Sequence, residues 1–195
     1  MDKLAEIKKV QVLMQNASEW NRMSEEERNQ VKERHQANES ECKGSAGLCL
    51  ETLNMLNYLT SDSVIREPFL LDSILPRFTS TLLNVLQRLV GSKSLEIKVD
   101  NMESYNFQPK VYLCEICSAM AHFHDSEIFW QAAAKDSFYN DGGPIRQAIS
   151  TVNRLHLVTP EEVSKLESLY ENVQRARVEF VDMVGSLALF FFLGD

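Results

Sequence analysis

Glycine and proline are scarce in this chain, whose 195 residues include only 7 glycines and 5 prolines. A sequence so poor in turn-forming residues favours long helices over the many short turns of a β-sheet architecture. The length predicts one domain, or one part of a larger domain. Hydrophobic residues make up 44% of the chain and charged residues 25%, a mixture typical of a folded protein rather than a disordered one.

A surplus of basic charge is also lacking. The chain has 20 lysines and arginines against 28 aspartates and glutamates, which gives a net charge of -8. Binding to a phosphate backbone depends on a surplus of lysine and arginine. The composition therefore argues against nucleic acid as a partner.

Signals for secretion or membrane insertion are absent from the pattern at both ends. Residues 1–15, MDKLAEIKKVQVLMQ, are charged and amphipathic, without the apolar core of a signal peptide. We therefore expect a cytoplasmic or nuclear protein whose four cysteines remain free thiols. The apolar run at residues 187–193 is less than half of the roughly 20 residues that a membrane span needs.

Apolar residues recur three or four positions apart along almost the whole chain, which is the spacing of amphipathic helices. Ser24 with Glu27, and Thr159 with Glu162, have the spacing of capping boxes at helix starts. Gly91 is predicted to end a helix in a left-handed conformation. Only residues 95–99 have an extended pattern, and one strand cannot build a sheet. The predicted helices cover residues 4–14, 24–60, 75–90, 109–123, 128–135, 144–155 and 159–184.

The predicted fold class is all-α, and helix pairs joined by short turns fit either a bundle or an α-solenoid. The longest predicted helix has two unlike halves. Its first half, residues 24–43, is almost wholly polar, so it either projects from the body or forms a solvated face. Its second half carries Cys49, Leu53 and Leu56 on one stripe, which we expect to be buried.

One group of side chains has the composition of a zinc site. Cys114 and Cys117 are followed closely by His122 and His124, and thiolates and imidazoles are zinc ligands. The gap between the two pairs is too short for the fold-back of a zinc finger, and Cys117 belongs to an apolar stripe. We therefore predict a thiol in the core. Because no nucleophile, phosphate-binding or dinucleotide motif is present, the sequence predicts no catalytic, cofactor-binding or metal-binding residue.

Residues 67–110 carry the most specific pattern in the chain. The pattern enters at Glu67-Pro68-Phe69-Leu70, leaves a helix at Gly91 and Lys93, and continues through residues 95–99 to Tyr105, Phe107 and Pro109. This pattern resembles the C-terminal part of the core domain of ubiquitin conjugation factors. These factors are ubiquitin-protein transferases that lengthen ubiquitin chains and carry a C-terminal U-box. The resemblance extends over roughly residues 4–180.

The resemblance implies an irregular, armadillo-like α-solenoid of stacked antiparallel helix pairs over residues 1–180. The apolar tail, residues 181–195, departs from the family pattern, and no U-box follows it. We therefore expect a scaffold segment of a ubiquitin-chain elongation ligase that is non-catalytic on its own and serves proteasomal degradation. The implied partners are the AAA segregase valosin-containing protein, ubiquitin-receptor shuttle factors and ubiquitylated substrates.

An alternative of a different class is a small helical adaptor tethered to a membrane by its C-terminal phenylalanine and leucine run. The short length of this run and the lack of flanking basic residues argue against it.

Overall fold

The computed structural model describes the chain except residues 92–93, 95–96 and 193–195, and it describes residues 185–192 by their backbone alone. Over this described part, the chain forms eight α-helices and short 3-10 turns, with no β-strand. The predicted all-α class is confirmed. Lys93 and the first two residues of the expected extended segment, Leu95 and Glu96, lie outside the described residues. Its remainder, residues 97–99, is irregular, and Ile97 and Val99 are buried on either side of the exposed Lys98.

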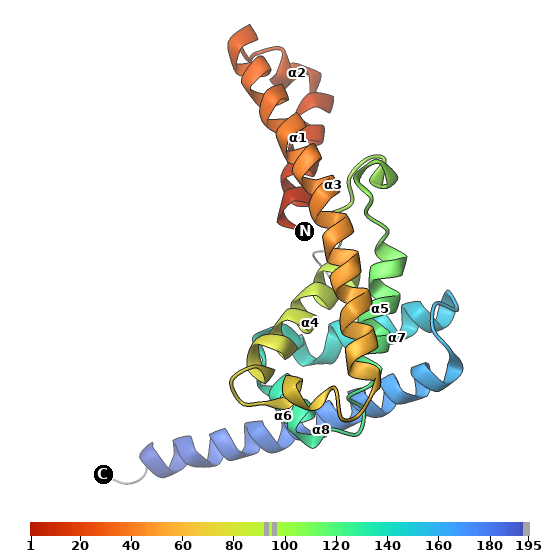
Figure 1. Ribbon diagram of the computed structural model, residues 1–195. Coiled ribbons are helices and arrows are strands. Elements are labelled where there is room, and N and C mark those ends of the chain that lie inside the picture. Colours follow the sequence, from red (N-terminus) through yellow and green to blue (C-terminus); the bar gives the residue numbers. More distant parts are fainter. Residues whose placement is uncertain (92–93, 95–96, 193–195) are drawn as a thin grey trace.

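The N-terminal part of the chain forms a projecting arm, which we define as residues 1–43 (Figure 1). It consists of α1 (Asp2–Gln15), α2 (Ala17–Trp20) and the first half of α3 (Glu25–Ser61). Both hydrogen bonds of the predicted capping box join Ser24 and Glu27 at the start of α3. Lys3 lies 3.1 Å from Glu41, and Glu6 accepts a bond from Asn38. Helix α1 therefore runs antiparallel to α3 and covers one side of its polar half.

The remaining helices and the second half of α3 form the body. These are α4 (Leu75–Val90), α5 (Pro109–Ala121), α6 (Glu127–Lys135), α7 (Gly143–Arg154) and α8 (Pro160–Phe192). Helix α3 packs against α5, α4 against α6, α5 against α7, and α6 against α8. Helices α4 and α5 also pack against α7 and α8, respectively, and α7 packs against α8. The body therefore combines contacts between alternate helices, as in the stacked repeats of a solenoid, with contacts between other pairs. The finer, armadillo-like description stays a prediction.

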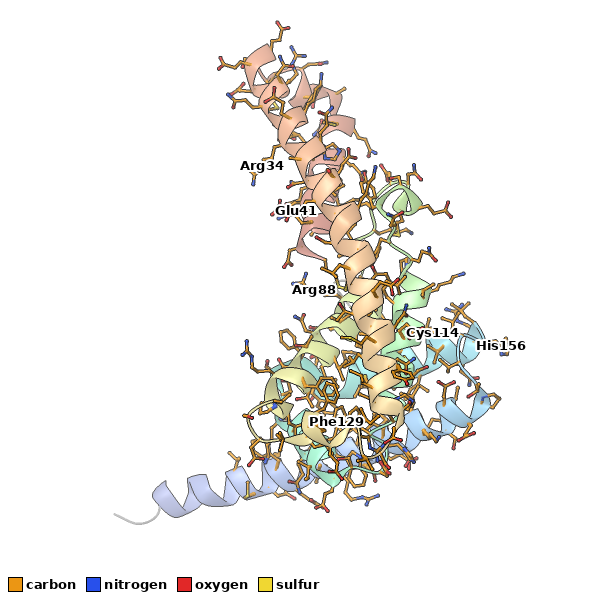
Figure 2. The ribbon with its side chains drawn as sticks, viewed as in Figure 1. Arg34, Glu41, Arg88, Cys114, Phe129 and His156 are labelled. Carbon is orange, nitrogen blue, oxygen red and sulfur yellow. The ribbon has the colours of Figure 1, made fainter. Side chains whose placement is uncertain are left out.

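An aromatic cluster forms the centre of the body. Phe123 and Phe129 stack with their ring centroids 4.7 Å apart, and Phe78 meets Phe123 edge-on at 5.5 Å. Phe129 lies low in the body in Figure 2. The stripe predicted for α5, which is Leu113, Ile116, Met120 and Phe123, is entirely buried. Edge-to-face and offset aromatic contacts add to the burial of apolar area, so this cluster joins α4, the turn after α5, and α6.

Gly91 ends α4 as predicted, but the left-handed conformation predicted for it was wrong. Its φ is -80° and its ψ is -169°, so the residue is extended rather than left-handed. Its N–H donates to the carbonyl of Gln87 at 2.8 Å, and a Cβ at this position would lie 2.5 Å from that same carbonyl oxygen. Gly91 is therefore required by a close approach of the backbone. The left-handed glycine of the described chain is Gly142, with φ +75°, at the start of α7.

The expected burial of Cys49 was also wrong. The buried stripe of α3 consists of Cys42, Ala46, Leu53 and Thr60. Cys49 follows Cys42 by two helical turns and lies on nearly the same side of α3, but there it lines an open hollow together with Leu4 and Tyr112, where α1 begins. Because α1 does not extend past this hollow, the Cys49 side chain stays exposed.

The last helix begins as predicted, because Thr159 and Glu162 form both bonds of a capping box. Helix α8 then continues without a break from Pro160 to Phe192 and so crosses the expected division between residues 180 and 181. Its predicted apolar face is buried at Val163, Leu166 and Val173, whereas Val184 is exposed. In Figure 1 its last turns project beyond the body. Among the helices described, none is both long and apolar enough to span a bilayer.

Candidate functional site: the joint between arm and body

The residues of the 67–110 pattern lie in two places. Glu67, Pro68, Phe69 and Leu70 form a 3-10 turn, η1 (Glu67–Leu70), that leads into α4. Tyr105, Phe107 and Pro109 lie at the other end of the body, where the 3-10 turn η3 (Met102–Tyr105) leads into α5. The η1 residues therefore lie in the body at the start of α4, and the residues at η3 and the start of α5 lie where the body meets the arm.

The η1 turn is anchored through its aromatic side chain. Glu67 and Pro68 are exposed, whereas Phe69 and Leu70 are half-buried. The Phe69 ring centroid lies 5.1 Å from that of Phe78, which belongs to the aromatic cluster. The turn thus docks one apolar face on the cluster and leaves its glutamate and proline in solvent.

An arginine just before η1 links it to the loop after α5. Arg66 donates two hydrogen bonds to Asp125, at 2.8 and 2.9 Å, and its guanidinium lies over the Phe123 ring. Partial burial acts to raise the pKa of Asp125, but the hydrogen bonds and charge of Arg66 outweigh it and lower that pKa. Both bonds come from the Nη2 nitrogen, while Nη1 donates to the carbonyl of His122, and charge-assisted bonds of this kind are stronger than neutral ones. The α3–α4 connection is therefore held in one position.

The joint between arm and body is formed around Tyr105. Its hydroxyl donates to Glu39 of α3 at 2.6 Å and accepts from Gln11 of α1 at 3.3 Å. Glu39 also lies 3.4 Å from His35. Burial, together with the neighbouring Glu39 carboxylate, raises the pKa of Tyr105 to about 12, so the phenol stays a proton donor. One tyrosine thus connects three separate segments.

Asp100 strengthens the same joint. Its carboxylate accepts from Gln15 at 2.7 Å and lies 3.6 Å from Lys8, and its backbone N–H donates to Gln11 at 2.9 Å. Arg88, near the end of α4, pairs with Asp2 at the start of α1. Helix α1 is therefore attached to the body mostly through polar side chains.

Phe107 and Pro109 continue the joint into the body. The Phe107 ring lies 5.0 Å from that of Tyr112, and the Tyr112 hydroxyl donates to the carbonyl of Ala46 in α3. Pro109 occupies the first position of α5, where the missing N–H costs nothing. Below this point, His122 pairs with Thr60 at 2.9 Å. Helices α3 and α5 therefore run side by side in the same direction.

The four side chains with the composition of a zinc site have separate partners. The Cys114 thiol donates to the carbonyl of Leu157 at 3.1 Å, close to the turn that carries His156 in Figure 2. His122 pairs with Thr60, and His124 contacts the carbonyl of Ala121. Cys117 is buried in the core, as its stripe predicted. Within the described chain no three metal-ligating side chains are grouped to hold an ion.

None of the four cysteines is an activated nucleophile. Burial raises the pKa of Cys42 and of Cys114, and it raises that of Cys117 to about 12. The walls of the hollow likewise raise the pKa of Cys49. A thiol reacts as its thiolate, which needs a lowered pKa. None of the four thiols therefore lies in surroundings that stabilise its thiolate.

Sequence reasoning missed Glu39, Gln11 and Arg66 as members of these contacts. A buried tyrosine hydroxyl requires a polar partner, so the pattern around Tyr105 contained a signal that some partner exists. It did not say which residue, because Glu39 lies 66 positions away in the chain. These contacts can be identified only when the relative positions of the helices are known.

Comparison with known proteins gives a family match that includes residues 67–110. A family model described as ubiquitin elongating factor core matches residues 1–174. The E4 ubiquitin-protein ligase UFD2 of Saccharomyces cerevisiae is 26% identical over 179 residues, which cover 91% of this chain and 18% of that protein. A probable ubiquitin conjugation factor E4 of Arabidopsis thaliana is 28% identical over 164 residues, which cover 80% of this chain and 16% of that protein. Ubiquitin conjugation factor E4 A of Mus musculus is 28% identical over 130 residues, which cover 66% of this chain and 12% of that protein. The chain thus spans less than a fifth of the length of these relatives.

Proposed function

The chain belongs to the ubiquitin elongating factor core family, and on this premise we propose that it is a helical scaffold segment of a ubiquitin-chain elongation ligase. In this role the segment holds other proteins in place while a ubiquitin chain is lengthened, and it forms no covalent intermediate itself. The observation that carries the proposal is the family match over residues 1–174, which includes both the joint and the body.

The chemistry of the thiols supports a non-catalytic role. A ligase that carries ubiquitin as a thioester needs a cysteine whose thiolate is accessible and stabilised. In this chain Cys117 is buried, and the pKa of each of the four thiols is raised. We infer that transfer is performed by a ubiquitin-charged conjugating enzyme. In the ubiquitin conjugation factors that this chain resembles, the U-box recruits this enzyme.

The partners proposed for this scaffold are proteins of the ubiquitin pathway. Ubiquitylated substrates, the AAA segregase valosin-containing protein and ubiquitin-receptor shuttle factors follow from the resemblance, as does a place in the cytoplasm or nucleus. The net charge of -8 supports protein partners rather than nucleic acid. A long arm set against a compact body also separates two surfaces by several helical turns, which suits a protein that holds two partners apart (Figure 1).

A reconstituted reaction tests the proposal. The 195-residue chain is mixed with activating enzyme, conjugating enzyme, ubiquitin and a ubiquitylated substrate. We expect no lengthening of the substrate's chain, and no reductant-sensitive ubiquitin adduct on the protein. A thioester adduct that disappears in a variant with Cys49→Ser or Cys114→Ser would show that the segment is catalytic, and the scaffold assignment would then be wrong.

A further inference from the structure

A groove lies between the first turns of α4 and the helix α6. Its volume is about 370 Å³, which is within the range of binding clefts in proteins. The other end of α4 meets the arm, where Arg88 pairs with Asp2, so the groove lies at the end of the body away from the arm (Figure 1). We call it the α4–α6 groove, and its lining includes Asp72, Pro76, Thr79, Ile128, Gln131 and Ala132.

Exposed aliphatic side chains lie in and beside this groove. Ile128 of α6 lines the groove and is 54% exposed. Leu71 and Ile74, on either side of Asp72 in the turn before α4, are 56% and 41% exposed. Apolar side chains gathered on a surface beside a cleft are typical of a contact site for another molecule. The composition of the groove therefore favours a partner that carries aliphatic side chains.

Acidic residues border the groove and its aliphatic side chains. Asp72 lines the groove, Glu67 begins the η1 turn, and Glu127 directly precedes Ile128. All three acidic residues are exposed. In the part of the chain that the structure describes, none of the three forms a salt bridge. Their charge is thus available to a partner.

Basic side chains of the same region do not neutralise this border. Arg66 is paired with Asp125. Lys135 lines the groove, but its ammonium lies over the Phe180 ring of α8, 5.8 Å from the ring centroid. Arg77 is exposed and does not line the groove. The groove therefore combines apolar walls with a border of net negative charge.

We propose that the α4–α6 groove binds a protein segment whose aliphatic side chains are flanked by lysine or arginine. The aliphatic side chains of this segment enter the groove beside Ile128, and its basic side chains meet Asp72, Glu67 and Glu127. Complementary charge of this kind speeds association and selects among partners. The proposal goes beyond the scaffold role, which does not say where on the segment a partner binds.

Occupants with negative charge fit the groove poorly. Nucleic acid and anionic lipid surfaces present phosphate groups, which the acidic border repels. A second copy of this chain brings a net charge of -8, and like charges placed opposite each other disfavour a complex. The occupant is therefore a basic, aliphatic protein segment rather than a nucleic acid, a membrane or a dimer partner.

Peptide selection tests the inference. Random peptides displayed on phage are selected for binding to the 195-residue chain, after removal of those that also bind the Ile128→Ser variant. We expect the retained peptides to combine aliphatic residues with lysine or arginine. Asp72→Lys should weaken their affinity, measured by calorimetry, by at least about threefold, and added salt should weaken it as well. Glu33→Lys on the arm and Leu48→Ser on α3 change exposed residues elsewhere, and as controls they should leave the affinity unchanged.

Several outcomes would overturn the inference. They are retained peptides that lack basic residues, an affinity that Asp72→Lys does not change, and a selection that leaves no peptide specific for the groove. A dimeric mass that becomes monomeric with Ile128→Ser would assign the groove to a second copy instead. If Ile128→Ser does not fold, Asp72→Lys replaces it in the selection and Glu67→Lys replaces Asp72→Lys in the calorimetry. Because neither ubiquitin nor an enzyme is present, the inference can fail while chain elongation by the family scaffold succeeds.

Discussion

The arm and the body of this protein are held together by different kinds of contact. In the body, the aromatic cluster of Phe78, Phe123 and Phe129 joins α4, the turn after α5, and α6, and α5 buries most of its residues. In the arm, α1 buries only Leu4 and Ile7 among its described residues. The rest of its attachment is polar, through the joint around Tyr105 and the pair between Arg88 and Asp2.

This difference predicts unequal stability within one chain. Apolar burial stabilises in proportion to the area removed from water, whereas exposed ion pairs contribute little and are weakened by salt. Regions with few buried apolar contacts open locally before the rest of the fold. The arm is thus the part that moves or opens first, and the body is the part that keeps its shape.

The largest effect is expected from the aromatic cluster. Phe123→Ala removes a fully buried ring, and we expect it to lower the free energy of unfolding by about 3–5 kcal/mol. Thermal or urea unfolding measures this loss. Phe69→Ala is the matched control, because its ring touches the same cluster but is half-buried. A loss no larger for Phe123 than for Phe69 would contradict the central role of the cluster.

A smaller and more local effect is expected at the joint. Tyr105→Phe removes the hydroxyl that bridges Glu39 and Gln11, and losing such a bond costs about 1–2 kcal/mol. Hydrogen exchange should become faster in α1 and in the first half of α3, while α5 and α6 keep their protection. Uniformly faster exchange across the body would show that arm and body do not open separately.

Substituting cysteines tests the interpretation that Cys117 is a core thiol rather than a zinc ligand. Cys117→Ala is expected to cost on the order of 1 kcal/mol through lost burial, with no change on adding zinc or a chelator. Cys49→Ala, in the open hollow, is the control and should change stability by less than about 0.5 kcal/mol. Zinc at about one equivalent in the purified protein, lost with Cys117→Ala, would replace the core interpretation by a metal site.

The dependence of stability on pH provides the smallest test. Burial lowers the pKa of His122 below its ordinary value of 6.5. The unfolded chain therefore binds a proton more readily, and the stability that neutral His122 contributes is lost as pH falls below about 6.5. His122→Gln should flatten the fall in melting temperature between pH 7 and pH 5. Asp125→Asn should lower the melting temperature at pH values above about 3.8, and its effect should disappear at lower pH, because the pairing with Arg66 that lowers the pKa of this carboxyl is lost on protonation.

Much of the fold could be predicted from local patterns. The helix starts at Ser24 and Thr159 depend on a few neighbouring residues, and the buried stripe of α5 follows from its spacing, so both were confirmed. Gly91 was predicted to be left-handed because glycine is common in that conformation, but here its missing Cβ avoids a clash with the Gln87 carbonyl. Burial of Cys49 depended on where α1 begins, which no local pattern contains.

The contacts of the candidate site could be predicted only in part. The resemblance selected Tyr105 and Phe107, which lie at the joint, and Phe69, which lies on the aromatic cluster. Their partners Glu39, Phe78 and Tyr112 come from other elements. Long-range pairs of this kind follow from how helices stack, so they require the structure.

We propose above that this segment is a scaffold that makes chain elongation effective without performing it. A U-box grafted after Phe180 tests this role, with the isolated U-box and the ungrafted 195-residue chain compared in the same reaction with a ubiquitylated substrate. We expect the graft to lengthen ubiquitin chains faster than the U-box alone, and the ungrafted chain to lengthen none. A graft no faster than the isolated U-box, or elongation by the ungrafted chain, would show that the segment is not a scaffold of this kind.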